Sequence, residues 1–112
     1  MAVYVKPLLG AKTLESIQTT QYTANGLTAI IDKITATNYS SSTVTVSVNI
    51  VTSGSTASND NLITKTKTLQ PSETYTFPEL VGQVLAPGGF VSTIASLSSS
   101  VNMRISGREV TY

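Results

Sequence analysis

The side chains best suited to chemistry near neutral pH are missing from this chain of 112 residues, which contains no His and no Cys. His is the usual general acid or base at this pH, and Cys is the readiest nucleophile. Six carboxylates remain. A glycosidase needs two of them facing each other across a cleft. Glu73 and Glu79 are close in sequence, but they straddle a short predicted strand and Pro78. We interpret both as turn and cap residues, which makes a hydrolase the least favoured function.

Other catalytic and ligand-binding patterns are also incomplete. A serine nucleophile needs a neighbouring base, and no Ser-x-x-Lys spacing offers a Lys in that role. The polar loop 58–61 supplies oxygen atoms but lacks the spaced acids and the bidentate Glu of a calcium loop. Gly88 and Gly89 are not followed by the Lys-Ser/Thr of a phosphate-binding loop. We therefore expect no enzymatic activity, no catalytic residue, no metal and no cofactor.

The charge pattern argues against nucleic acid and membrane as partners. Seven basic and six acidic residues give a net charge of +1, and only 12% of the residues are charged. Nucleic-acid affinity comes largely from a dense basic patch, whereas the cations here are scattered. Lys65 and Lys67 are two apart, so in a strand they are predicted to share one solvated face. The sequence has no apolar run long enough to cross a bilayer and no signal-peptide pattern at residues 1–6, so we expect synthesis in the cytoplasm of the producing cell.

Strand patterns dominate the rest of the chain. The clearest lies at residues 43–52, where every second residue is aliphatic and the residues between are polar, which predicts a central strand with one buried face. The aliphatic members are Val44, Val46, Val48 and Ile50, opposite Thr43, Thr45, Ser47 and Asn49. Further strands are predicted at residues 14–23, 28–38, 62–69, 74–77, 90–98 and 101–111. Turn signals recur every eight to twelve residues, a rhythm typical of an all-β sandwich or barrel.

Local irregularities refine this prediction. Asp32 shares the parity of the apolar residues in its strand, and a charge on the core face predicts a bulge near Ile31. Gly107 interrupts the last strand and suggests a second bulge. Residues 78–85 have a Pro followed by helical apolar spacing, which predicts one short helical turn. The predicted fold class is all-β, a two-sheet antiparallel sandwich in a single domain (1–112), with seven or eight strands and at most one short helical turn.

Two apolar segments are the candidate contact surfaces. Residues 1–12 form an edge segment or an extended N-terminal arm, because Pro7 cannot donate to a strand ladder and residues 3–9 are too apolar for a free tail. The second segment is 80–85. For both segments, packing in the core is the alternative to contact with a partner. The candidate interface residues are Tyr4, Val5, Leu8, Leu9, Leu80, Val81, Val84 and Leu85.

Three tracts give the chain a resemblance to a known group of proteins. They are residues 74–85 followed by Pro87-Gly88-Gly89, the ending 106–111, and residues 29–38. Together they resemble small virion proteins encoded beside the capsid genes of tailed bacteriophages. The resemblance implies a jelly-roll decoration (cement or staple) protein on the outside of an icosahedral head. It implies binding to the major capsid protein, self-association as a homodimer or homotrimer, and bridging of neighbouring capsomers, and it carries no active-site residues.

On this basis we expect a structural virion protein whose apolar arm and one sheet edge dock on the shell. Removal of residues 1–9 is then expected to abolish capsid binding and to leave the fold intact. The alternative is a tail-associated or carbohydrate-binding β-sandwich module for host attachment. Sugar sites usually present exposed aromatic rings, and this chain has five Tyr but no Trp.

Overall fold

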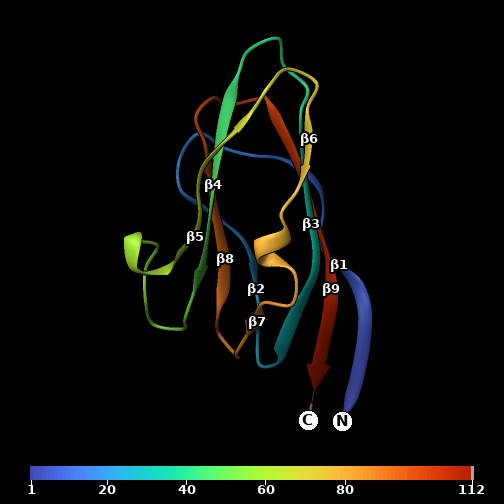
Figure 1. The fold of residues 1–112 in the computed structure, drawn as a ribbon. Helices are drawn as coiled ribbons and strands as arrows, with labels where there is room; N and C mark the ends of the chain where they lie inside the picture. The colour runs from blue at the N-terminus through green and yellow to red at the C-terminus, as the bar shows by residue number, and fades with distance from the viewer. Residues whose placement is uncertain (112) are drawn as a thin grey trace.

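Alternation of apolar and polar residues along the chain produces two antiparallel sheets packed face to face, as seen in the computed structural model, which describes residues 1–111 (Figure 1). The elements are β1 (Ala2–Thr13), β2 (Thr19–Thr23), β3 (Thr28–Asn38), β4 (Val44–Val51), η1 (Asn59–Asn61), β5 (Leu62–Leu69), β6 (Thr74–Thr76), η2 (Pro78–Leu80), β7 (Val84–Leu85), β8 (Phe90–Ala95) and β9 (Val101–Thr111). The two η elements are single 3-10 turns. No helix within residues 1–111 has the length and apolar character to cross a bilayer.

The strand order is that of a jelly roll. The first sheet, sheet A, has the order β1-β9-β3-β6, with β7 also paired to β3, and sheet B has the order β2-β8-β4-β5. The pairs are nested: β1 with β9, β2 with β8, β3 with β6 and β7, and β4 with β5. When β6 and β7 are counted as one interrupted strand, eight strands form the two four-stranded sheets of a jelly roll. This order confirms the predicted two-sheet antiparallel sandwich.

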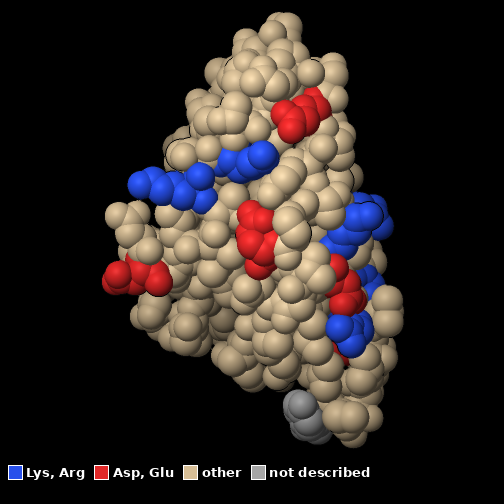
Figure 2. Space-filling model, in the orientation of Figure 1, with Lys and Arg blue, Asp and Glu red and all other residues tan. Residues whose placement is uncertain are grey.

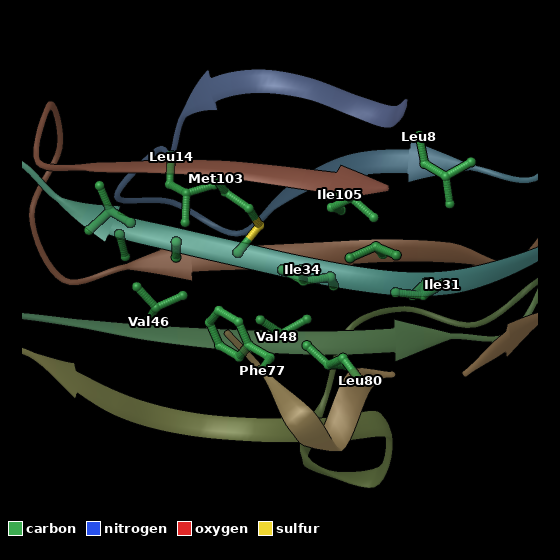
Figure 3. Packing of buried hydrophobic residues seen from close by; sticks show 14 of the residues in the cluster. Leu8, Leu14, Ile31, Ile34, Val46, Val48, Phe77, Leu80, Met103 and Ile105 are labelled. Atoms are coloured by element: carbon green, nitrogen blue, oxygen red, sulfur yellow. The ribbon is translucent and has the colours of Figure 1, made fainter. Parts of the chain in front are cut away.

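The core fills the space between the sheets, and β4 contributes to it as predicted. Val44, Val46 and Val48 are fully buried, and β4 lies between β8 and β5 in sheet B. Figure 3 shows Val46 and Val48 facing side chains from sheet A such as Ile34 and Met103. A central position protects this uncharged strand, which would be prone to aggregate at an open edge.

The interruption between β6 and β7 completes the core. Here the chain leaves the edge of β3, and η2 places Phe77 and Leu80 between the two sheets, where both side chains are fully buried (Figure 3). The ring of Tyr75 packs edge-on against Phe77, with 4.8 Å between ring centroids. The predicted helical turn is therefore a single 3-10 turn, and it ends early because Gly82 takes a φ of +81° and Val84 pairs with β3.

Of the two predicted bulges, the one near Ile31 is present, and the prediction of a bulge at Gly107 is wrong. The register of β3 against β9 shifts between Ile31 and Lys33, so Asp32 is an extra residue and the predicted bulge is confirmed. Strand β9 itself is continuous through Gly107. On its other side, β1 bulges at Leu8. A Cβ at Gly107 would meet the Ile30 carbonyl oxygen and, at 2.8 Å, Leu8 Cδ1, so glycine is required for this close packing and not for a bulge of its own.

A bulge in β5 overturns one prediction. Val46 pairs with Lys67 and Val48 pairs with Thr64, so Lys65 and Thr66 together oppose the single residue Ser47. The side-chain alternation therefore changes phase between Lys65 and Lys67. Lys67 lies on the core side of β5, with its ammonium 4.4 Å from the centre of the Tyr75 ring, whereas Lys65 borders a cavity on the outer face of sheet B. The prediction that the two lysines share a face is wrong.

Other boundaries differ modestly from the sequence-based ranges. The N-terminal segment is the long edge strand β1, which corresponds to the edge segment and not to the free arm of the two alternatives. Residues 14–18 form a turn, so the strand predicted at 14–23 begins at Thr19. Strand β8 ends at Ala95 instead of residue 98.

Candidate interaction surface

The carboxylates are dispersed and structural. Glu73 accepts a hydrogen bond from the Gln70 backbone N–H in the turn before β6, at 2.7 Å. Glu79 accepts hydrogen bonds from the hydroxyls of Thr64, at 2.5 Å, and Tyr75, at 3.2 Å. Burial raises the pKa of Glu79, but the hydrogen bonds outweigh it and the net pKa is lowered. Among residues 1–111, no three acidic side chains come close enough to hold a metal ion. The expectation that the protein is not an enzyme stays a prediction.

The eight candidate interface residues divide into two groups. Leu8, Leu80 and Leu85 are buried in the core, and Leu9 packs against it. The other four are exposed: Tyr4, Val5, Val81 and Val84, with Val5 the most exposed at 82%. For the buried residues the core explanation holds, because each fills the space between the sheets.

The structure joins the two candidate segments in one row across sheet A. Val5 on β1 pairs with Arg108 on β9, Arg108 pairs with Ile30 on β3, and Ile30 pairs with Val84 on β7. Directly opposed residues point to the same face, and Val84 is 56% exposed, so the row lies on the outer face. With strands about 4.8 Å apart, it spans about 14 Å. We name Val5, Arg108, Ile30 and Val84 the sheet A row.

The one cation in this row is neutralised locally. The guanidinium of Arg108 donates to both carboxylate oxygens of Asp32, the bulged residue of β3, at 2.8–3.2 Å. The bulge places Asp32 beside Arg108 on the outer face. Val3, which is exposed, and Val110, which is buried, form the adjacent aliphatic pair. The result is an aliphatic strip interrupted by one paired ion, the composition expected of a protein-binding face more than of a solvated one.

The sheet A row ends at an open sheet edge. Within residues 1–111, β1 pairs on one side only, with β9. The exposed side chains of Tyr4 and Val5 project to opposite faces of this edge. Pro7 and the bulge at Leu8 limit any further strand pairing to residues before Pro7. Residues 2–6 therefore offer a short template for addition of a strand from another chain.

Charged and phenolic groups fix the inner side of this edge. Tyr22 on β2 donates a hydrogen bond of 2.5 Å to Glu109 on β9, and the ammonium of Lys6 on β1 lies 3.2 Å from the same carboxylate. The hydrogen bond from Tyr22 is the main cause that lowers the pKa of Glu109. Burial, reinforced by Glu109, raises the pKa of Tyr22 well above its ordinary value. The edge strand β1 is therefore linked through Glu109 to both β9 and β2.

Two cavities flank the strands. A cavity of about 120 Å³ opens beside Val84, with Ile50 and Pro87 among its lining residues. A larger one, of about 220 Å³, lies on the outer face of sheet B beneath loop 53–61. Figure 2 shows charged side chains scattered over the visible face, with broad uncharged areas between them.

Sequence reasoning missed three members of the aliphatic strip: Val3, Ile30 and Val110. Val3 shares the parity of Val5, so strand alternation could have identified it. Ile30 could not be placed without the bulge at Asp32, which reverses the faces on its two sides. The nearness of Val5 and Val84 depends on the order of four strands, for which the sequence has no local signal.

Comparison with known proteins adds little to this description. No protein-family model matches the chain, and no curated protein matches it in sequence. One solved structure, that of the Gx strain of infectious bursal disease virus, aligns with a TM-score of 0.41 and 11% sequence identity, over 98% of this chain and 42% of that chain. The chain thus spans less than half the length of the chain it matches. We draw no functional argument from so distant an alignment.

Proposed function

We propose that this protein is a structural virion protein that binds the outside of a bacteriophage capsid and bridges neighbouring capsomers. The support is the jelly-roll strand order, which agrees with the fold implied by the sequence resemblance, together with the sheet A row beside the open edge of β1. The row is the observation that carries the proposal. It brings two exposed apolar segments, distant in sequence, onto one face.

Binding of this kind suits a surface without reactive groups. A capsid bridge strengthens the shell by burying area across a joint, and many copies repeat a modest interface. Aliphatic side chains of the sheet A row supply apolar contact, and residues 2–6 supply backbone groups for strand addition. The partners in this proposal are the major capsid protein and a second or third copy of this chain. The site of action is the exterior of the virion, after synthesis in the host bacterial cytoplasm.

Residues 1–9 cannot be removed as a test of capsid binding without damage to sheet A. Removal of residues 1–9 would also remove the buried Leu8 and expose the paired edge of β9, so the fold would not survive unchanged. Single substitutions on the outer face avoid this problem. Val5→Glu and Val84→Glu each introduce a charge at a position that is more than half exposed. Ile17→Glu, at a 71% exposed position in the turn before β2, is the matched control.

The test is co-sedimentation of each variant with empty heads assembled from the major capsid protein of the phage that encodes this chain. We expect Val5→Glu and Val84→Glu to weaken binding at least about tenfold, because a buried unpaired charge costs more than 1.4 kcal/mol. Ile17→Glu should bind like the unmodified protein. Equal binding by all three variants would remove the sheet A row from the proposal. Light scattering tests self-association, since the monomer mass is 11.8 kDa; a monomer at all concentrations would contradict that part.

The alternative is a tail-associated or carbohydrate-binding module for host attachment. Saturable binding to a glycan array, with no binding to heads, would favour it over capsid decoration.

A further inference from the structure

Strand β5 contains a strained residue where a regular strand would have none. Thr66 has a φ of +45°, in the left-handed region. A β-branched residue is rare there, because its side chain crowds the backbone. Two serines with positive φ, Ser72 and Ser99, lie in turns, whereas Thr66 lies inside a paired strand. Strain of this kind is concentrated at functional sites.

The strained bulge separates the two lysines. Lys65 follows the core-facing Thr64 in regular alternation and borders the cavity of about 220 Å³ on sheet B, and the extra residue at Thr66 turns Lys67 to the core side. The backbone N–H of Thr66 donates a 2.8 Å hydrogen bond to the Ser47 hydroxyl, which holds the bulge in place. Bulges re-aim side chains in this way beside active and binding sites. Among residues 1–111, Lys65 takes part in none of the three ion pairs.

One wall of the cavity is held in position by the buried amide of Asn49, and the exposed amide of Gln18 borders the same cavity. Asn49, 3% exposed, donates from Nδ2 to the Ser58 carbonyl oxygen at 2.9 Å and to Asn61 Oδ1 at 2.7 Å. These bonds anchor loop 53–61 over the outer face of β4. Gln18 Nε2 donates to Ser92 Oγ at 2.8 Å, and no hydrogen bond within residues 1–111 uses Gln18 Oε1. Lys65 and the exposed Gln18 amide thus place a charged donor and an acceptor at the border of one cavity.

The remaining lining is apolar and small. Leu62, Ile94 and Ala57 border the same cavity. Its volume is below the range of about 300–1,000 Å³ typical of drug-sized ligands, so it suits one small ring. The occupant should carry one negative charge for Lys65, hydroxyls for the Gln18 amide and Ser47, and an aliphatic C–H face for Ile94. A single uronic acid unit has all three features.

We propose that this cavity binds a hexuronic acid residue, with its carboxylate on the Lys65 ammonium and its hydroxyls on Gln18 and Ser47. The site is on the outer face of sheet B, whereas the sheet A row is on the opposite face of the sandwich. Sugar binding and capsid binding can therefore occur together, and neither depends on the other.

The test is an NMR titration of the full-length protein with D-glucuronate, in low salt, at concentrations up to about 50 mM. We expect saturating shifts of the backbone amides of Ser47, Lys65 and Thr66, with a dissociation constant on the order of 1 mM, as suits a small open site. D-Glucose, which lacks the carboxylate, should bind at least about tenfold more weakly. Acetate, which lacks the ring, should also bind at least tenfold more weakly.

Two matched variants decide the role of the lysine. Lys65→Met should weaken glucuronate binding at least about tenfold, while Lys67→Met, the same charge change on the same strand, should leave it unchanged. Absence of saturable shifts with glucuronate would overturn the proposal. Equal affinity for acetate and glucuronate would overturn the assignment to a sugar, and equal loss in the two variants would show a general charge effect instead of a site. Head co-sedimentation by Lys65→Met should be normal, which separates this inference from the proposed function.

Discussion

Tyr22 and Glu109 join the two sheets of the sandwich by a side-chain hydrogen bond of 2.5 Å between residues 87 positions apart in sequence. Tyr22 lies on β2 of sheet B and Glu109 on β9 of sheet A. Apolar side chains fill most of the space between the sheets, and this polar clamp lies near the free edge strand β1. Its strength depends on pH because both groups titrate.

The first prediction concerns this pH dependence. The pKa of Glu109 is lowered in the folded state, chiefly by the Tyr22 hydrogen bond, so its stabilising contribution is present above about pH 4.5 and is lost as the pH falls further. The pKa of Tyr22 is raised, chiefly by burial, so its contribution is present below pH 10 and is lost as the pH rises above that value. Chemical denaturation between pH 3 and 11 should therefore show both losses.

Tyr22→Phe should lower the free energy of unfolding at pH 7 by about 1–2 kcal/mol, since it removes a hydrogen bond to a charged group. It should also flatten both limbs of the pH profile. Tyr39→Phe is the control, because Tyr39 is half exposed and its hydroxyl makes only a 3.4 Å contact with Thr13. A Tyr22→Phe variant with the full pH dependence would assign that dependence to other groups.

The second prediction tests the close packing at Gly107. Gly107→Ala places a methyl group against the Ile30 carbonyl oxygen and the side chain of Leu8, and the backbone cannot yield as a flexible side chain would. We expect a loss of about 3 kcal/mol in the free energy of unfolding, measured by urea denaturation. Gly10→Ala, on the neighbouring strand β1, meets nothing within 4 Å and should be neutral or slightly stabilising. Equal effects at both positions would contradict the packing argument.

The third prediction measures the strain in β5. Thr66→Gly relieves the positive φ and should leave the thermal unfolding midpoint unchanged or raised, because the relief offsets the extra chain entropy of glycine. Thr68→Gly, two residues later in the same strand and also exposed, relieves no positive φ and should cost about 1 kcal/mol. If Thr66→Gly is as destabilising as Thr68→Gly, the bulge stores no strain.

The fourth prediction concerns Phe77, the core residue that lies between β6 and β7 in the chain. Phe77→Ala should destabilise the fold by about 3–5 kcal/mol, because it empties a fully buried site and removes the edge-on contact with Tyr75. Thr76→Ala, on the preceding exposed residue, should change stability by less than about 0.5 kcal/mol. Differential scanning calorimetry compares the unfolding midpoints of the two variants. A Phe77→Ala midpoint near that of Thr76→Ala would contradict the prediction, because it would mean that the core refills the emptied space with no loss of stability.

Sequence reasoning succeeded where one face of a strand is strictly apolar. The bounds of β3 and β9 agree with the prediction, and the bulge at Asp32 was predictable because a charge on the core face conflicts with the strand pattern. In β5 both faces carry polar residues, so the sequence contains no charge on a core face that would predict the bulge at Lys65 and Thr66. The prediction that Lys65 and Lys67 share one face was wrong for this reason.

The sequence predicted the two candidate segments as contact surfaces. It did not predict which of their residues are buried in the core and which are exposed. The apolar spacing of residues 80–85 fits a helix, yet pairing with β3 draws Val84 and Leu85 into a strand, which buries one and exposes the other. The Tyr22–Glu109 clamp and the sheet A row arise from long-range strand order. No local pattern in the sequence encodes them.

The pairing of β1 with β9 has a consequence for biosynthesis. Strand β9 lies between β1 and β3 in sheet A and is the last of the nine strands to be synthesised. Until it forms, the backbone groups of β1 and β3 that pair with β9 have no partner. Such non-local closure slows folding to the millisecond-to-second range and leaves nascent chains exposed to association with one another. Yield during expression should therefore depend more on temperature and chain concentration than on the stability of the finished sandwich.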